Sequence, residues 1–138
     1  MSKKSGKIAE LIEQFHGREL NAYYLGYFEC FNRQLFYEAH DVLEELWLPE
    51  RKGCNGDFFK GLIQLAGAFV HLQKNRLKPA AALFRLARAN LEKYPQQHER
   101  LQIPGLLRVV EWWLQELETH NFQRNPLVFH HAPMLSPE

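Results

Sequence analysis

The sequence has few of the features that mark a secreted, membrane-bound or nucleic-acid-binding protein. Its 138 residues include only two cysteines, Cys30 and Cys54, and no C-x-x-C pair, which favours a reduced, cytoplasmic protein. No apolar run approaches the roughly 20 residues that a membrane-spanning helix needs, and no apolar signal-peptide core follows the N-terminal lysines. The formal net charge of +1 favours neither a nucleic acid nor an anionic membrane as a partner.

Short enzyme motifs are also missing. The chain has no H-E-x-x-H motif, no phosphate-binding glycine loop and no G-x-S-x-G turn. A carboxylate-bridged two-metal bundle would need two E-x-x-H motifs on separate helices, and only Glu13–His16 has that spacing. The pair His130 and His131 could bind a metal only loosely. Cys30 falls on the polar side of its predicted helix without an adjacent base, so we do not expect a nucleophile there.

Helical periodicity dominates the chain, and strand-like alternation is scarce. The apolar spacing predicts helices over about residues 5–15, 20–48, 57–75, 79–94 and 104–120, with an extended tail over about 121–138. Hydrophobic residues make up 46% of the chain, enough to build the core of one domain spanning 1–138. The short connections predict an all-α fold, a single up-and-down bundle of about five helices.

The third predicted helix, 57–75, is apolar around most of its circumference, so we expect it at the centre of the bundle. Gly61 and Gly67 lower its helix propensity, and we expect them to mark close helix crossings. Pro49 is expected to end the preceding helix. In the tail, three consecutive apolar residues are expected to hold the segment on the bundle: Leu127, Val128 and Phe129.

An unusual concentration of polar groups occupies the end of the second predicted helix. Helical rotation of about 100° per residue sorts these groups into two sets. His40 and Glu44 share one side of the apolar stripe, whereas Glu38 and Glu45 share the opposite side, with Asp41 between them. This arrangement indicates a polar site at a seam between helices, but it does not identify a reaction.

On the third predicted helix, Gln64 and His71 lie two turns apart, with Gly67 between them. If this line faces His40 and Glu44, the groups converge in one pocket. Zinc, manganese and iron accept imidazole and carboxylate ligands, and a carboxylate can also orient an imidazole as a general base. The sequence therefore predicts a pocket that binds a metal ion or a small polar ligand, lined by Glu38, His40, Glu44, Gln64 and His71. A divalent transition metal would be held by His40, Glu44 and His71.

Simpler interpretations stand beside this one. His40 and Glu44 could form only a surface ion pair, the acidic residues could form a solvated face, and Gln64 and His71 could be satisfied by neighbouring groups. The protein could then be a non-catalytic interaction or self-association module, a homo-oligomer included. The polar motif would fix helix register, and the aromatic second helix, Trp112 and the apolar tail would form the contact surface. Nucleic-acid binding through the basic segment Arg76–Arg88 is the least favoured alternative.

The polar segment and the third predicted helix resemble a known family, domain of unknown function 309, which comprises small all-helical proteins of bacteria and archaea. The resemblance covers about residues 27–92 and is carried by Phe31-Asn32, Phe36-Tyr37-Glu38-Ala39-His40-Asp41-Val42-Leu43-Glu44-Glu45-Leu46-Trp47, Phe58-Phe59-Lys60-Gly61-Leu62-Ile63-Gln64-Leu65-Ala66 and His71. Asp41 stands where the family more often has glutamate. The resemblance implies a helical bundle and marks Glu38, His40, Glu44, Gln64 and His71 as motif residues. It implies no established activity.

Overall fold

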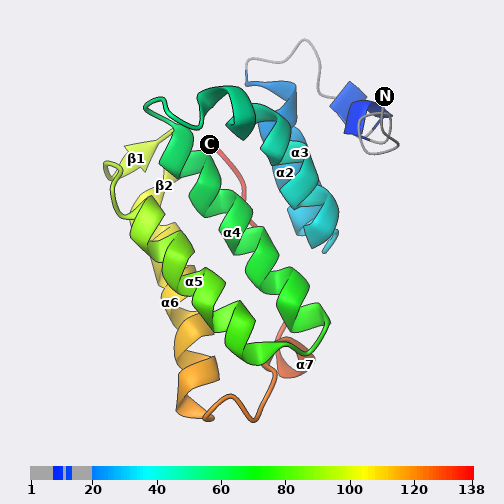
Figure 1. The fold of residues 1–138 in the computed structure, drawn as a ribbon, viewed down its shortest axis with the longest axis vertical. Helices are drawn as coiled ribbons and strands as arrows, with labels where there is room; N and C mark the ends of the chain where they lie inside the picture. The colour runs from blue at the N-terminus through cyan, green and yellow to red at the C-terminus, as the bar shows by residue number, and fades with distance from the viewer. Residues whose placement is uncertain (1–7, 11, 14–19) are drawn as a thin grey trace.

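The computed structural model describes residues 8–10, 12–13 and 20–138 (Figure 1). Its elements are α2 (Ala22–Asn32), α3 (Phe36–Glu50), α4 (Gly56–Gln73), α5 (Leu77–Leu91), β1 (Gln97–His98), β2 (Leu101–Gln102), α6 (Ile103–Thr119) and α7 (Pro126–Phe129). The all-α prediction is confirmed, since the only strands of the described residues form one two-residue antiparallel pair. No helix among them is both long and apolar enough to cross a membrane. Much of the predicted first helix lies outside the described residues, and so does His16 of the Glu13–His16 motif.

Helix α4 is central, as its apolar circumference predicted. It packs against α3 on one side and α5 on the other, and α6 packs on α5 (Figure 1). Its Phe69 is fully buried, and four rings from four other helices surround it at centroid distances of 5.0–5.6 Å. The Phe36 ring is stacked on it at 5.0 Å, and the Phe31 ring lies edge-on at 5.6 Å. The rings of Phe84 and Trp113 lie edge-on to Phe69 at 5.4 and 5.0 Å. Aromatic packing around one side chain thus joins α2, α3, α5 and α6 to α4.

The prediction of one helix over 20–48 is wrong, because the chain breaks after Asn32 and restarts at Phe36. Gln34 adopts a left-handed conformation with φ of 61°. The amide of Leu35 donates to the Cys30 carbonyl at 2.8 Å and that of Gln34 to the Phe31 carbonyl at 2.9 Å, which is a Schellman ending. The break also changes which side of α2 faces inward: Cys30, predicted on the polar side, is buried.

Pro49 does not end α3 where the sequence predicted, because it lies inside the last turn and the helix continues to Glu50.

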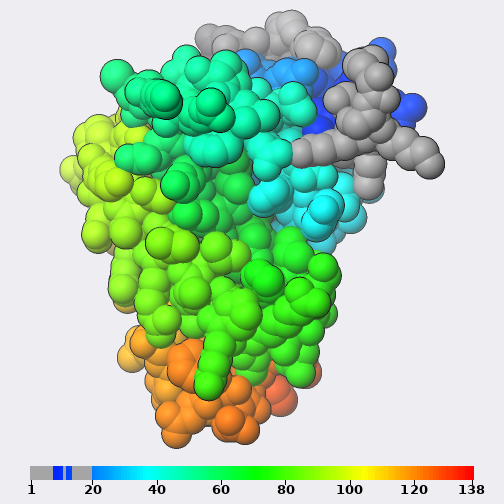
Figure 2. All heavy atoms as spheres, viewed as in Figure 1, coloured from blue at the N-terminus to red at the C-terminus, as the bar shows by residue number. Residues whose placement is uncertain are grey.

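Two glycines of α4 mark close helix crossings, as the sequence predicted. A Cβ atom on Gly61 would lie 2.9 Å from Leu91 Cγ, and one on Gly67 would lie 3.1 Å from Leu83 Cδ1. Both glycines therefore let α5 approach α4 closely, and side chains of α3, α4 and α5 fill the face shown in Figure 2.

The tail is anchored differently from its prediction. Part of it forms the short helix α7, and Val128 and Phe129 are 73% and 57% exposed, so these two side chains do not hold it. Leu127 is partly buried, and the main anchor is Leu135, which is 8% exposed. The Asn32 side chain donates to the Leu135 carbonyl and accepts from its amide, both at 2.7 Å. One amide side chain of α2 thereby pairs with the backbone of a segment 103 residues away.

Candidate functional site

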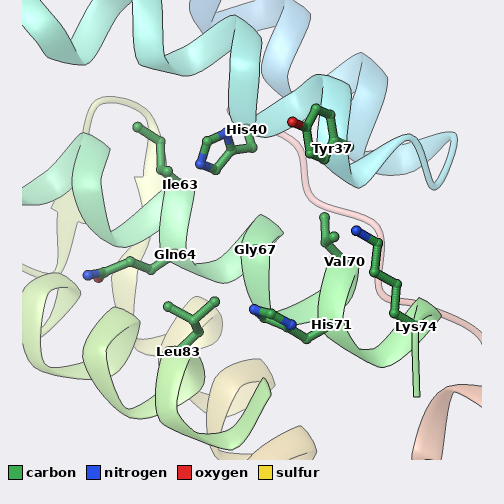
Figure 3. Close-up of a pocket in the computed structure, with 9 residues that line it drawn as sticks. All are labelled: Tyr37, His40, Ile63, Gln64, Gly67, Val70, His71, Lys74 and Leu83. Atoms are coloured by element: carbon green, nitrogen blue, oxygen red, sulfur yellow. The ribbon is translucent and has the colours of Figure 1, made fainter. Parts of the chain in front are cut away.

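A cavity of about 290 Å³ lies between α3 and α4 and is bounded on the third side by α5 (Figure 3). Its lining consists of two residues of α3, one of α5, and six that belong to α4 or directly follow it: Tyr37, His40, Ile63, Gln64, Gly67, Val70, His71, Lys74 and Leu83. Gly67 has no side chain, so the space above it stays open between the two imidazole rings. The predicted seam between these helices therefore contains a pocket, and His40, Gln64 and His71 line it.

His40 projects from α3 over Gly67, and one nitrogen lies at the tip of its ring (Figure 3). Its Nδ1 lies 3.2 Å from Asp41 Oδ1. Because a carboxylate can only accept, this contact places a proton on Nδ1 and leaves Nε2 of the neutral ring as an acceptor. Tyr37 stacks on the ring, with centroids 6.3 Å apart and planes 27° apart. The sequence suggested Glu44 as the partner of His40, whereas the structure pairs His40 with Asp41.

His71 faces the same space from α4. Burial lowers the pKa of His71, and the positive charges of Arg76 and then Lys74 lower it further, so the ring is neutral at pH 7. Although the residue as a whole is half-buried, its Nδ1 is fully buried and has no hydrogen-bond partner among the described residues. A buried donor without a partner is rarer in proteins than an under-satisfied acceptor. This favours the tautomer that carries its proton on Nε2.

Gln64 is bonded to α5. Its Oε1 accepts a hydrogen bond from Asn90 Nδ2 at 2.8 Å, and Lys93 Nζ donates to Asn90 Oδ1 at 3.2 Å, which fixes the orientation of the Asn90 amide. The Gln64 amide extends away from the space between the two imidazole rings (Figure 3). As the simpler interpretation of the sequence proposed, a neighbouring group satisfies the oxygen atom of Gln64, and this hydrogen bond joins α4 to α5.

Glu38 and Glu44 do not line the pocket. Glu38 is two residues from His40, which turns it to another side of α3. Since α3 and α4 run antiparallel with Phe36 stacked on Phe69, Glu44 lies one turn nearer the start of α4 than His40 does. Among the described residues, no three histidine, cysteine, aspartate or glutamate side chains are placed to hold a metal ion. The geometry gives the predicted set of His40, Glu44 and His71 no support.

Two polar residues of the pocket escaped the sequence analysis. Tyr37 precedes His40 by three residues, and Lys74 follows His71 by three. Side chains three apart lie on one face of a helix, so this spacing is a signal that could have found both. The pocket then offers the His40 imidazole as an acceptor, the Lys74 ammonium as a donor, the Tyr37 hydroxyl, which can do both, and apolar walls. It can bind a polar ligand, and His40 backed by Asp41 can also accept a proton from one.

The fold and the pocket define a small helical bundle with a compact site between two neighbouring helices. Residues 24–83 match the family model described as Domain of unknown function (DUF309), which supports the family resemblance seen in the sequence. The match contains α3, α4 and every lining residue of the pocket. No curated protein and no solved structure matches the chain.

Proposed function

We propose that the protein binds a small organic molecule in the pocket between α3 and α4. The observation that carries this proposal is that His40 and His71, on separate helices, line one cavity together with Gln64. Ligand sites commonly combine apolar walls with a few convergent polar groups, and their volumes begin near 300 Å³. A volume of about 290 Å³ is at the lower end of that range and indicates a small ligand.

The interaction-module alternative receives less support. Large exposed apolar side chains do occur, but they are spread over several elements: Tyr37, Leu48, Leu86, Trp112, Val128, Phe129 and Met134. Trp112 packs edge-on against Trp113 and His130, at 5.1 and 4.8 Å. A scattered distribution of this kind is ordinary for a protein surface and outlines no single contact area.

A fragment screen followed by two-dimensional NMR tests the proposal. We expect hits whose chemical-shift changes centre on the amides around His40, Gly67 and His71, with dissociation constants in the millimolar to micromolar range typical of fragments. Zn²⁺ and Mn²⁺ are included in the screen. Selective binding of either metal in the pocket would support the metal site that the sequence predicted and would contradict the proposal of an organic ligand.

Gly67→Leu places a side chain in the pocket and should abolish these shifts. Gly105→Leu is the matched control, because a Cβ atom at Gly105 meets nothing closer than Arg108 Nη2 at 3.6 Å. A thermal melt shows whether each variant is folded. If Gly67→Leu is unfolded, the variants His40→Ala and His71→Ala take its place, and each should weaken the binding of the hits. Hits that bind elsewhere, or that survive both kinds of change, would overturn the proposal.

A further inference from the structure

We propose that the ligand of this pocket is an anion: a small oxyanion, carboxylate or phosphate ester, carried on a short apolar body. The charged oxygen atoms would lie between His71 and Lys74, with the apolar part against Ile63 and Leu83. This inference rests on the proposed function, because it names the chemical class of the molecule that the pocket takes.

The charges around the pocket favour an anion. Lys74 is the one lining residue with a permanent charge, and no aspartate or glutamate is among the lining residues. Arg76, which follows α4, acts on His71 together with Lys74, and both lower its pKa. A group that feels two cations sits at a positive potential, and such a potential attracts an anion. On the α3 side, the carboxylate of Asp41 contacts Nδ1 of His40 at 3.2 Å.

The hydrogen-bonding groups lead to the same class. Lys74 can only donate, and the favoured tautomer of His71 has its proton on Nε2. Because Nδ1 of His71 is fully buried, the imidazole acceptor that a ligand can reach is Nε2 of His40, and the donors of Lys74 and His71 outnumber it. Oxyanions accept several hydrogen bonds at once, and charge-assisted bonds of this type are about twice as strong as neutral ones. A neutral amide or alcohol would leave part of this donor set unused.

Ile63, Val70 and Leu83 line the rest of the space, so an inorganic ion alone would leave apolar walls in contact with water. Burying an apolar body against them contributes roughly 25 cal/mol per Å². The ligand class is therefore amphipathic, and benzoate, isovalerate and phenyl phosphate are suitable probes. Sulfate is the probe for an anion without an apolar part.

Anion binding should also take up a proton. The titratable and charged groups around His71 are Tyr37 and the His40–Asp41 pair from α3, and Lys74 and Arg76 after the end of α4, while α5 contributes the apolar Leu83. An anion at His71 would favour its imidazolium form and raise its pKa. Affinity for an acid that stays ionised should then rise as the pH falls from 8 towards 6.

Matched pairs of probes test the inference by NMR titration: benzoate against benzamide, and isovalerate against isovaleramide, with phenyl phosphate to distinguish the two oxyanions. We expect the carboxylates or the phosphate ester to bind at least about fivefold more tightly than the neutral partners, and sulfate to bind more weakly than either. Lys74→Gln should weaken anion binding by about fivefold, whereas Lys78→Gln, an exposed lysine outside the pocket, should leave it unchanged. His71→Gln should remove the pH dependence.

The outcomes separate the two proposals. If benzamide binds in the pocket as tightly as benzoate, the anion inference is overturned while the small-molecule pocket stands. If anions bind there with the same affinity at pH 6 and pH 8, the proton uptake at His71 is overturned. If no probe and no fragment of the wider screen binds in the pocket, both proposals fail together.

Discussion

The hydroxyl group of Tyr27 is buried in the core and donates to the Leu62 carbonyl of α4 at 2.6 Å. Burial raises the pKa of Tyr27, so the phenol stays neutral and keeps its proton for this bond. Tyr27→Phe should lower the free energy of unfolding by about 1 kcal/mol, because the hydrogen bond is lost while the ring still fills its site. Urea denaturation measures the change, and Tyr37→Phe, on a 58% exposed side chain, should change it by less than about 0.5 kcal/mol.

Two glycines of α4 should respond differently to the same substitution. A Cβ atom at Gly61 would lie 2.9 Å from Leu91 Cγ and 3.3 Å from Asn90 Cβ, inside a buried crossing. A Cβ atom at Gly67 meets only one flexible methyl group, that of half-buried Leu83 at 3.1 Å. Alanine adds up to about 1 kcal/mol of helix propensity at either position. Overpacking costs about 1–3 kcal/mol.

We therefore expect Gly61→Ala to lower the melting temperature and Gly67→Ala to leave it nearly unchanged. Differential scanning calorimetry of the two variants gives the comparison directly. If Gly61→Ala were as stable as the wild type, the crossing of α4 and α5 would be looser than its distances indicate.

Helical elements were predictable where the apolar stripe is continuous and the ends carry ordinary signals. The start and end of α4 and of α6 agree with the sequence to within two residues. The end of α2 was missed because Gln34 takes a left-handed position that usually holds glycine or asparagine. The short strands β1 and β2 were not predicted, and the turn that pairs them likewise holds non-glycine residues in the left-handed region, since Glu99 and Arg100 have φ values of 47° and 60°. In both places tertiary contacts outweigh local preference.

The spacing of apolar residues in the tail does not identify the residues that anchor it to the bundle. Asn32 pairs with the backbone of Leu135 through two bonds of 2.7 Å, and the Leu135 side chain is buried. Asn32→Ala should destabilise the fold by about 2 kcal/mol, because it removes two hydrogen bonds and leaves two backbone groups without partners. Leu135→Ala should cost about 2–3 kcal/mol. Met134→Ala, on a 75% exposed neighbour, is the control and should be close to neutral.

A double-mutant cycle between Asn32 and Leu135 distinguishes a cooperative anchor from two independent contacts. If the tail is held as a unit, the double variant should lose less stability than the sum of the two single losses, by at least about 0.5 kcal/mol. Strict additivity would mean that the side chain of Leu135 stays in place without Asn32.

At the scale of the whole molecule, the candidate site depends on which helix faces meet. Periodicity on each helix alone placed His40, Gln64 and His71 near a seam, and the structure brings these three to one pocket. The same reasoning could not exclude Glu44, because the axial offset between α3 and α4 is set by the Phe36–Phe69 contact rather than by either stripe. Nor could it give Gln64 its partner, since Asn90 lies on α5. The position of Glu44 relative to the pocket and the partner of Gln64 both depend on how α3, α4 and α5 pack together, which the pattern of a single helix does not contain.

Protonation of His71 connects the pocket to the stability of the fold. Burial, followed by the charges of Arg76 and Lys74, lowers its pKa in the folded protein, whereas the unfolded chain retains a value of about 6.5. Between these two values the unfolded state binds more protons, so the free energy of unfolding rises with pH there and decreases as the pH falls from about 7. His71→Gln has no such group to protonate.

Urea denaturation at pH 7.5, 6.5 and 5.5 should therefore show the wild type losing stability relative to His71→Gln as the pH falls. His131→Gln, on an exposed tail residue, should follow the wild type at every pH. A constant difference between the wild type and His71→Gln would mean that His71 titrates alike in the folded and unfolded states. A wild type that gained stability relative to the variant would place an unrecognised anionic group beside the ring, and the positive potential on which anion binding depends would not exist.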